Sequence, residues 1–285
     1  MNAIITGANA GIGKEAAVQL AKAGYEVILA CRNADRARVA REEIVERSGG
    51  AAEIMLCDVS SQKSVRAFCE TFSRRATGLD VLINNAAHFD PGARERLITD
   101  EGQESVWATN HLGPFLMTHL LGPQLEKAGG RVINVSSKGL VTYPFLELNL
   151  EDPTLSGRPF SMQRAYYHSK LAVVISTVDL ARRWAARGIA LNTVRVTNVK
   201  VDASRYPGMS PLQRKLYSLK SRYSIEPSVM AETYTWLATS PEVKAWSGKH
   251  VDERHRVLRY RPYVLRPEVQ EKLYRLSARS VGLEG

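Results

Sequence analysis

Short apolar segments alternate with longer amphipathic stretches in this chain, and this alternation constrains its fold more than any other feature. The apolar runs cover residues 2–6, 27–30, 52–57, 81–83 and 132–135. Runs of this kind are typical of strands in a parallel sheet that helices cover on both faces. The sequence therefore predicts an α/β fold. No repeat, low-complexity tract or Gly/Ser linker interrupts the 285 residues, which favours a single domain over residues 1–285.

A membrane span and a metal site are not expected. The chain has no basic-then-apolar leader, and no stretch approaches the roughly 18 apolar residues that cross a bilayer. Cys31, Cys57 and Cys69 are odd in number and lack the spacing of metal ligands or of a disulfide framework. These features predict a cytoplasmic protein without a bound metal.

The formal net charge of +10 does not by itself identify a partner. Arginines are dispersed along the chain and are densest over residues 254–266, a pattern typical of solvated faces. A basic groove interleaved with aromatic residues, or a recognisable nucleic-acid-reading motif, is absent from the sequence. We therefore expect a small-molecule substrate and no nucleic-acid partner.

A glycine-rich segment follows the first apolar run directly, because residues 6–14 read Thr-Gly-Ala-Asn-Ala-Gly-Ile-Gly-Lys. An Ala/Leu-rich stretch comes next and stops at Gly24, which is typical of a helix. Glycines allow a tight turn and a close backbone approach to a pyrophosphate, which the free N–H groups and the dipole of the helix start attract. The order strand, glycine loop, helix predicts a dinucleotide site.

The end of the second apolar run indicates which dinucleotide binds. An NAD site usually has a carboxylate there for the ribose 2′-hydroxyl, whereas this chain has Cys31 followed by Arg32. A guanidinium can bind a 2′-phosphate through paired charge-assisted hydrogen bonds. We predict NADP(H) as the cofactor, and a solvated Arg32 is the alternative.

Tyr166 and Lys170 lie four residues apart in a segment expected to be helical, so they share one face. An ammonium beside a phenol favours the phenolate and lowers the tyrosine pKa, which permits proton transfer near neutral pH. The spacing is common by chance, so a solvated pair is the alternative when it is taken alone.

Several motifs occur together and in a fixed order. They are the glycine loop, Asn84-Asn85-Ala86-Ala87, Asn110 in Thr-Asn-His-Leu-Gly-Pro-Phe, Ser137 in Asn-Val-Ser-Ser, and Tyr166 with Lys170. In this combination the chain resembles the short-chain dehydrogenase/reductases, and Ala30-Cys31-Arg32-Asn33 is similar to the branch of retinol dehydrogenases and related carbonyl reductases. The resemblance implies a Rossmann-like fold, with a seven-stranded parallel sheet between two helical layers, and a homo-oligomer, typically a dimer or tetramer.

The resemblance also implies roles for individual residues. Tyr166 would transfer the proton, and Ser137 would hydrogen-bond the substrate oxygen. Lys170 would stay charged, lower the Tyr166 pKa and bind the nicotinamide ribose, while Asn110 would position a water between Lys170 and solvent. Asp58 would hold the adenine, although from the residues alone it could also cap a helix. The expected cofactor-binding residues are Gly7, Asn9, Gly11, Ile12, Gly13, Arg32, Asn33, Asp58, Val59, Asn85, Ala86, Ala87, Tyr166, Lys170 and Val199.

The segment after the sixth strand departs from the family pattern. In place of Pro-Gly-x-Val-x-Thr, residues 196–201 read Val-Thr-Asn-Val-Lys-Val, so we expect a different loop path. Residues of about 197–225 would form the substrate-binding loop and helices, although their apolar spacing also fits a helix that only packs on the domain. Candidate walls for a lipophilic or aromatic substrate are Phe89, Tyr143, Phe145, Tyr206, Met209, Leu212, Leu216, Tyr217, Leu219 and Tyr223.

The leading interpretation is an NADP(H)-dependent oxidoreductase acting on a carbonyl or an alcohol, because all four expected catalytic groups are present. The alternative is a non-catalytic NADP(H)-binding sensor or partner protein, which only the altered loop favours. Tyr143, Tyr167 and His168 could in principle also transfer a proton. Tyr167 lies about 100° around the helix from Tyr166 and so would not share the face of Lys170.

Overall fold

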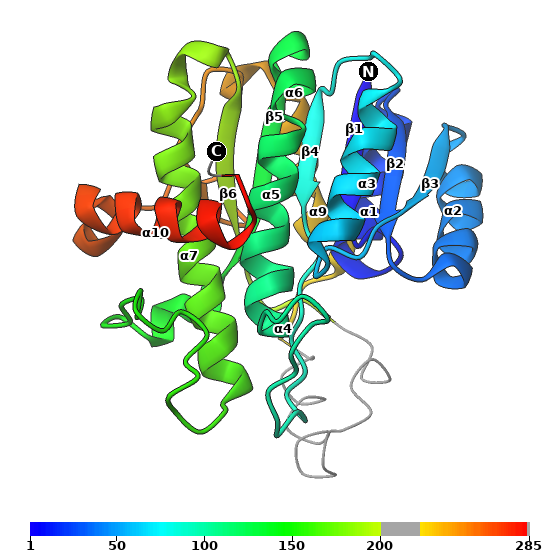
Figure 1. Cartoon of the computed structure of the whole chain (residues 1–285). Helices are drawn as coiled ribbons and strands as arrows, with labels where there is room; N and C mark the ends of the chain where they lie inside the picture. Colours follow the sequence, from blue (N-terminus) through cyan, green and yellow to red (C-terminus); the bar gives the residue numbers. More distant parts are fainter. Residues whose placement is uncertain (201–222, 284–285) are drawn as a thin grey trace.

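Seven strands form one sheet in the order β3-β2-β1-β4-β5-β6-β7 (Figure 1). The computed structural model describes residues 1–200 and 223–283. All neighbouring strands pair in parallel. The strands are β1 Asn2–Thr6, β2 Glu26–Cys31, β3 Ala52–Leu56, β4 Val81–Asn84, β5 Arg131–Ser137, β6 Ala190–Val196 and β7 His250–Val251. The expected seven-stranded parallel sheet is confirmed.

Helices cover both faces of this sheet. The α-helices are α1 Gly11–Lys22, α2 Ala34–Ser48, α3 Gln62–Ser73, α4 Ser105–Trp107, α5 Gly113–Leu120, α6 Gly122–Ala128, α7 Met162–Arg183, α9 Pro227–Thr239 and α10 Pro267–Ser280. Shorter turns are the π-helical η1 Ala108–Leu112 and the 3-10 turns η2 Lys138–Thr142, η3 Ala185–Arg187, η5 Pro241–Val243 and η6 Pro262–Leu265. The α10 helix lies across α7 (Figure 1).

Alternate strand residues enter two separate cores, as the period of a strand requires. Ile4 and Val132 pack with α3, α5 and α7, whereas Ile5 and Ile133 pack with α1, α2 and α9. Both faces of the central strands are therefore buried, and this explains why their runs are mostly apolar.

The first helix ends close to the position that the sequence predicts. α1 ends at Lys22, and Gly24 has the left-handed φ of 84° that a non-glycine residue rarely adopts. By contrast, the sequence did not identify α10, whose buried residues include Val269 and Leu273.

β1 lies between β2 and β4, so the chain connections diverge on either side of it. In open α/β sheets, ligands bind at such a switch point, outside the carboxyl ends of the strands. These ends lie at the lower edge of the sheet in Figure 1. The glycine loop, Arg32, Asp58, Asn85 and Ser137 all follow or end a strand there.

Candidate functional site

The glycine loop packs closely on itself and on the end of β4 at the start of α1. Gly7 and Gly11 have φ values of 65° and 56°. A Cβ atom on Gly13 would lie 2.5 Å from Asn85 Nδ2 and 2.8 Å from the Gly7 carbonyl oxygen. The N-cap residue Ala10 offers no side-chain hydrogen bond to the helix. The first N–H groups of α1 are thus left for an anionic ligand, which fits the pyrophosphate of a dinucleotide.

Thr6 ties this loop to the end of β4. Its Oγ1 accepts hydrogen bonds from the N–H groups of Asn85 and Ala86, each at 2.9 Å. The Asn85 side chain donates in return to the Thr6 carbonyl oxygen at 2.9 Å. Sequence reasoning assigned Thr6 no role of its own. The only local signal was its position directly before the first glycine.

Arg32 and Asp58 meet at the adjoining strand ends, with Arg32 Nη1 at 3.6 Å from Asp58 Oδ2. The Arg32 side chain is 77% exposed, so its guanidinium is open to a ligand. Asp58 Oδ1 accepts hydrogen bonds from the Ser60 N–H and hydroxyl. The residue that caps α3 is Ser61, so Asp58 is not the helix cap that the residues alone allowed.

The neighbours of these two residues serve the fold as well. Asn33 caps α2, because its side-chain oxygen accepts from the Arg36 N–H at 2.8 Å. Val59 is buried in the core, and its carbonyl oxygen would lie 1.9 Å from a Cβ on Gly113. Asn33 thus uses its side-chain oxygen as a helix cap, and the Val59 backbone packs closely against Gly113.

Cys31 occupies the place where an NAD site usually has a carboxylate. Its side chain is buried, and burial raises the pKa of the thiol to about 11 even though the N–H groups of Ala8 and Asn9 hydrogen-bond to it. The backbone of the glycine loop is therefore hydrogen-bonded to an uncharged thiol.

Tyr166 and Lys170 share one face of α7. Lys170 Nζ lies 5.7 Å from the centroid of the Tyr166 ring, and it donates a hydrogen bond to the Val135 carbonyl oxygen at 2.8 Å. Lys170 is 2% exposed, and burial lowers the pKa of its ammonium to about 7. Tyr166 is half-buried, with its ring 4.7 Å from that of Phe89.

Asn110 lies in the π-helical turn η1 and points inward. Its Oδ1 accepts from the His88 N–H at 2.7 Å, and its Nδ2 donates to the Ser169 hydroxyl at 3.0 Å. The Ser169 hydroxyl donates to the Tyr166 carbonyl oxygen at 2.7 Å. Ser169 therefore connects the η1 turn to the helical turn that carries Tyr166 and Lys170.

Ser137 ends β5 and caps the η2 turn, where its Oγ accepts from the Gly139 N–H at 3.2 Å. Because Lys170 is bonded to Val135 on the same strand, the structure brings the end of β5 to the face of α7 that carries the tyrosine. Four predicted groups, Asn110, Ser137, Tyr166 and Lys170, thus lie on elements that contact one another.

Comparison with known proteins identifies the family. Residues 1–147 match the family model described as short chain dehydrogenase. The chain belongs to the short-chain dehydrogenase family of oxidoreductases.

Its relatives agree with the expected branch of this family. The chain is 34% identical to retinol dehydrogenase 14 of Mus musculus, over 98% of this chain and 85% of the relative. It is 32% identical to retinol dehydrogenase 13 of Homo sapiens, over 99% and 84%. A solved structure, a putative uncharacterized protein from Mycobacterium paratuberculosis, matches with a TM-score of 0.73 and 26% identity, over 99% and 93% of the two chains.

The neighbouring aromatic and imidazole side chains of this short-chain dehydrogenase have structural partners. The rings of Tyr143 and Tyr167 lie 4.8 Å apart. His168 is buried and accepts from the Asn149 N–H at 2.9 Å, and burial lowers the pKa of its imidazole to about 4. It is thus a neutral residue of the core.

Most of the predicted substrate-binding segment, residues 201–222, lies outside the described residues. The candidate wall residues that fall there are Tyr206, Met209, Leu212, Leu216, Tyr217 and Leu219. Of the others, Phe145 is 94% exposed and Tyr223 is 86% exposed. Val199 forms an isolated parallel bridge with Ile225 and packs against the core of the α1 face.

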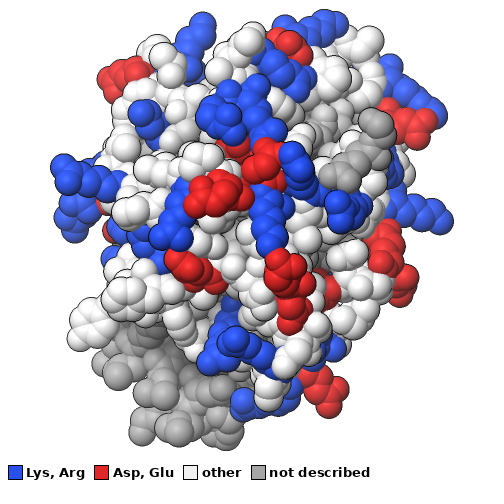
Figure 2. Space-filling model, turned by 60° about the vertical axis from the view of Figure 1, so that its left-hand side comes forward, with Lys and Arg blue, Asp and Glu red and all other residues white. Residues whose placement is uncertain are grey.

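Charged side chains of both signs are interspersed on the face shown in Figure 2. Some of the C-terminal arginines bind the chain itself and are not simply solvated. Arg256 pairs with the buried Asp252 at 2.6 Å, and Arg261 donates to the Tyr143 and Pro144 carbonyl oxygens. Within residues 1–200 and 223–283, no helix is long and apolar enough to cross a membrane, and no group of three or more His, Cys, Asp or Glu residues is arranged to bind a metal ion.

Proposed function

We propose that this short-chain dehydrogenase is an NADP(H)-dependent oxidoreductase that interconverts a carbonyl compound and an alcohol. The observation that carries the proposal is the approach of Lys170 Nζ to the Tyr166 ring on α7. This pair lies at the carboxyl ends of the strands, where the glycine loop also lies. We take residues 1–285 as one catalytic and cofactor-binding domain, because the predicted residues on either side of the switch point belong to one sheet.

The described residues fit a bound NADP(H). The β1–α1 turn, tightened by Gly7 and Gly13 against β4, would hold the pyrophosphate. Arg32 would bind the 2′-phosphate, and the absence of a carboxylate at Cys31 removes a repulsion that this phosphate would otherwise meet. Bound NADP(H) would supply or accept a hydride at its nicotinamide ring.

Side chains of α7 and β5 would donate the proton to the substrate oxygen and stabilise the negative charge that develops on it. In reduction, the Tyr166 hydroxyl would donate its proton to the carbonyl oxygen, and the Ser137 hydroxyl would hydrogen-bond that same atom as negative charge develops on it. In oxidation, the tyrosinate would act as the base. Lys170 in its charged form favours the phenolate. Asn110, held by His88 and Ser169, would position a water that passes protons between Lys170 and solvent.

The substrate would be a lipophilic or aromatic alcohol or carbonyl compound of the retinoid type. Phe89 lies directly beside the proton-donating tyrosine, and Tyr143 packs on Tyr167 at the start of the same helix. The relatives named above are retinol dehydrogenases, which supports the same class of substrate. We also propose a homo-oligomer in the cytoplasm, to be tested by analytical ultracentrifugation and by cell fractionation.

Replacement of Tyr166 by Phe tests the proposal, with Tyr167→Phe as the matched control on the same helix. We expect turnover of all-trans-retinal with NADPH to fall by at least about 100-fold in Tyr166→Phe, the usual minimum contribution of a positioned general acid. NADPH binding, followed by its fluorescence, should persist in both variants. Retained turnover in Tyr166→Phe contradicts the assignment.

The second candidate is a non-catalytic NADP(H)-binding protein, which the altered segment at residues 196–200 favours. It predicts NADPH binding by the wild-type protein without turnover of any member of a broad carbonyl and alcohol panel.

A further inference from the structure

The π-helical turn that carries Asn110 is held in place by the C-terminal helix. π-turns are rare and lie frequently at functional sites. On one side of η1, the Asn110 side chain is bonded to His88 and Ser169. On the other side, the next residue, His111, lies 2.8 Å by its Nε2 from the hydroxyl of Ser277 on α10.

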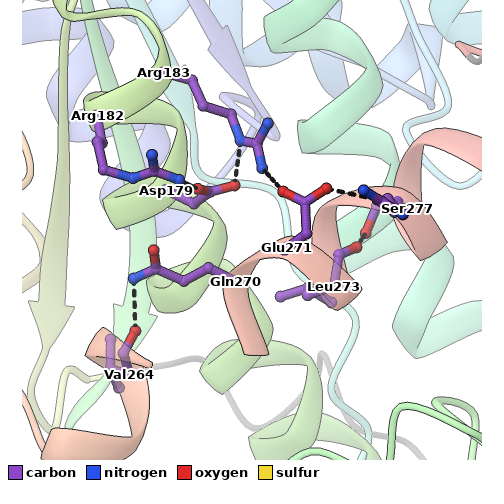
Figure 3. A network of polar contacts seen from close by, with 9 residues as sticks. Asp179, Arg182, Arg183, Val264, Gln270, Glu271, Leu273 and Ser277 are labelled. Carbon is purple, nitrogen blue, oxygen red and sulfur yellow. Dashed lines mark hydrogen bonds and ion pairs between the residues drawn. The ribbon is translucent and has the colours of Figure 1, made fainter. Parts of the chain in front are cut away.

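The direction of this hydrogen bond follows from the chemistry of the hydroxyl. Ser277 Oγ donates its one proton to the Leu273 carbonyl oxygen at 2.8 Å, one turn earlier in α10 (Figure 3). It can therefore only accept from His111, whose Nε2 must carry a hydrogen. Both side chains are buried, His111 at 1% and Ser277 at 0% exposure. Loss of the acceptor would leave a donor without a partner in the core, which is costly.

α10 is itself anchored firmly enough to serve as a support. Arg183 on α7 bridges Asp179, at 2.6 Å, and Glu271 of α10, at 2.5 Å (Figure 3). The guanidinium of Arg183 also lies 3.9 Å from the centroid of the Tyr274 ring. At the other end of α10, Gln62 donates to the Ser280 carbonyl oxygen at 2.9 Å. The acceptor for His111 thus has a fixed position relative to α7.

We propose that Ser277 and His111 are positioning residues that hold Asn110 in the position required for proton relay. The α10 helix thus supports the active site. The inference rests on the proposed function, because it assigns a support to the proton-relay residue. Ser277 acts through Asn110 and does not itself contact the substrate or the cofactor. The prediction is therefore a defect in turnover, with little change in the affinity for NADPH.

Ser277→Ala tests this, and Ser280→Ala is the matched control. The Ser280 hydroxyl makes the same intrahelical bond, to the Leu276 carbonyl oxygen, but within residues 1–200 and 223–283 it has no histidine partner. In Ser277→Ala we expect kcat to fall about tenfold, as when a supporting contact lets a reacting group shift by less than 1 Å. The KM for NADPH should stay within about twofold, and Ser280→Ala should match the wild type in both constants.

A double-mutant cycle separates positioning from a general loss of stability. If Ser277 acts through Asn110, adding Ser277→Ala to Asn110→Ala lowers kcat no further, whereas independent effects multiply. A full additional tenfold loss in the double variant overturns the proposal, as does a wild-type kcat in Ser277→Ala. Should the alanine variant not fold, Ser277→Cys keeps the side-chain shape, weakens the acceptor and allows the same comparison.

Amide hydrogen exchange gives a readout that does not depend on turnover. Peptides covering residues 108–112 should exchange faster in Ser277→Ala than in Ser280→Ala, because the π-turn has lost one of its supports. Equal exchange in the two variants refutes the support by α10. If the two variants differ in exchange but the wild-type protein turns over no substrate, the proposed function is refuted and the support by α10 is not. The two failures are therefore distinguishable.

Discussion

At the scale of single residues, Lys170 combines two demands that oppose each other. Its proposed role needs a positive charge, yet the side chain is 2% exposed and burial lowers its pKa to about 7. A buried ammonium that donates to a backbone carbonyl oxygen and has no carboxylate partner among the described residues costs free energy in the folded state. We therefore expect that burial of the Lys170 ammonium beside Tyr166 lowers the free energy of unfolding.

The pH dependence of stability should reveal this cost. Between about pH 7 and pH 10.4 the unfolded chain keeps the Lys170 proton that the folded chain has lost, so the stability of the protein without cofactor rises with pH. Below about pH 7 Lys170 is protonated in both states, and the folded protein bears the full free-energy cost of burying the ammonium. Lys170→Met should therefore be more stable than the wild type near pH 6, and its advantage should shrink by about pH 9.

Urea unfolding at these pH values checks the prediction, with exposed Lys22→Met as the control. The control should follow the wild-type pH dependence. A stability difference between Lys170→Met and the wild type that does not change with pH would contradict the assigned cost.

Arg32 is the residue on which the choice of cofactor rests. Its exposed guanidinium can make paired hydrogen bonds with a 2′-phosphate, so Arg32→Ala should raise the KM for NADPH about tenfold to a hundredfold and leave that for NADH nearly unchanged. Arg74→Ala, which removes an exposed arginine paired with Glu70, controls for the change in net charge. Equal shifts for both cofactors, or tighter NADH binding by the wild type, would refute an NADP(H) preference.

At the scale of elements, the junction between the β1–α1 loop and the end of β4 is the least tolerant part of the site. Gly13 has no room for a Cβ, because Asn85 Nδ2 and the Gly7 carbonyl oxygen lie within 2.8 Å of its ideal position. Gly13→Ala must push the loop away from β4. We expect a loss of about 1–3 kcal/mol in the free energy of unfolding, as for other overpacked sites.

The same variant should weaken NADPH binding, because the displaced backbone is the proposed pyrophosphate site. Gly157→Ala is the control, since among the described residues a Cβ there would meet only Asp152 Oδ2, at 3.6 Å. Thermal unfolding and fluorescence titration with NADPH measure the two effects. A Gly13→Ala protein that equals Gly157→Ala in both assays would show that the junction can relax.

At the scale of the whole molecule, buried histidines should make the protein sensitive to acid. Burial lowers the pKa of His168 and of the partly buried His250 to about 4, and that of the buried His111 to about 3. Their unfolded pKa is about 6.5, so below that pH the unfolded state binds protons that the folded state excludes. The free energy of unfolding should therefore fall as the pH drops from about 6.5 to 4.

Replacement of His168 by Gln isolates one contribution. The amide can still accept from the Asn149 N–H but does not titrate in this range. The loss of stability between about pH 6.5 and pH 4.5 should be smaller in this variant than in the wild type when both are unfolded with urea. Parallel curves for the two proteins would show that His168 does not contribute to the acid sensitivity.

Much of the fold could be predicted from the sequence because it depends on local patterns, and local motifs also led to the predicted site residues. A strand buried on two faces is mostly apolar, and the five runs named from the sequence correspond to β1 through β5. The glycine loop and the Tyr166/Lys170 spacing are likewise local, and the first needs only a strand before it and a helix after it. These features determined the family and most of the sheet.

The contacts that hold the site together lie beyond the reach of local patterns. Thr6 and Asn85 are 79 residues apart, Asn110 and Ser169 are 59 apart, and His111 and Ser277 are 166 apart. No periodicity connects such pairs, because only the packing of distant elements brings them within hydrogen-bond distance. The sequence by itself determined the chemistry available at the carboxyl ends of the strands. Tertiary structure alone decided how deeply Lys170 is buried, that Asn110 lies in a π-turn and that α10 supports this turn, because each depends on the three-dimensional meeting of distant elements.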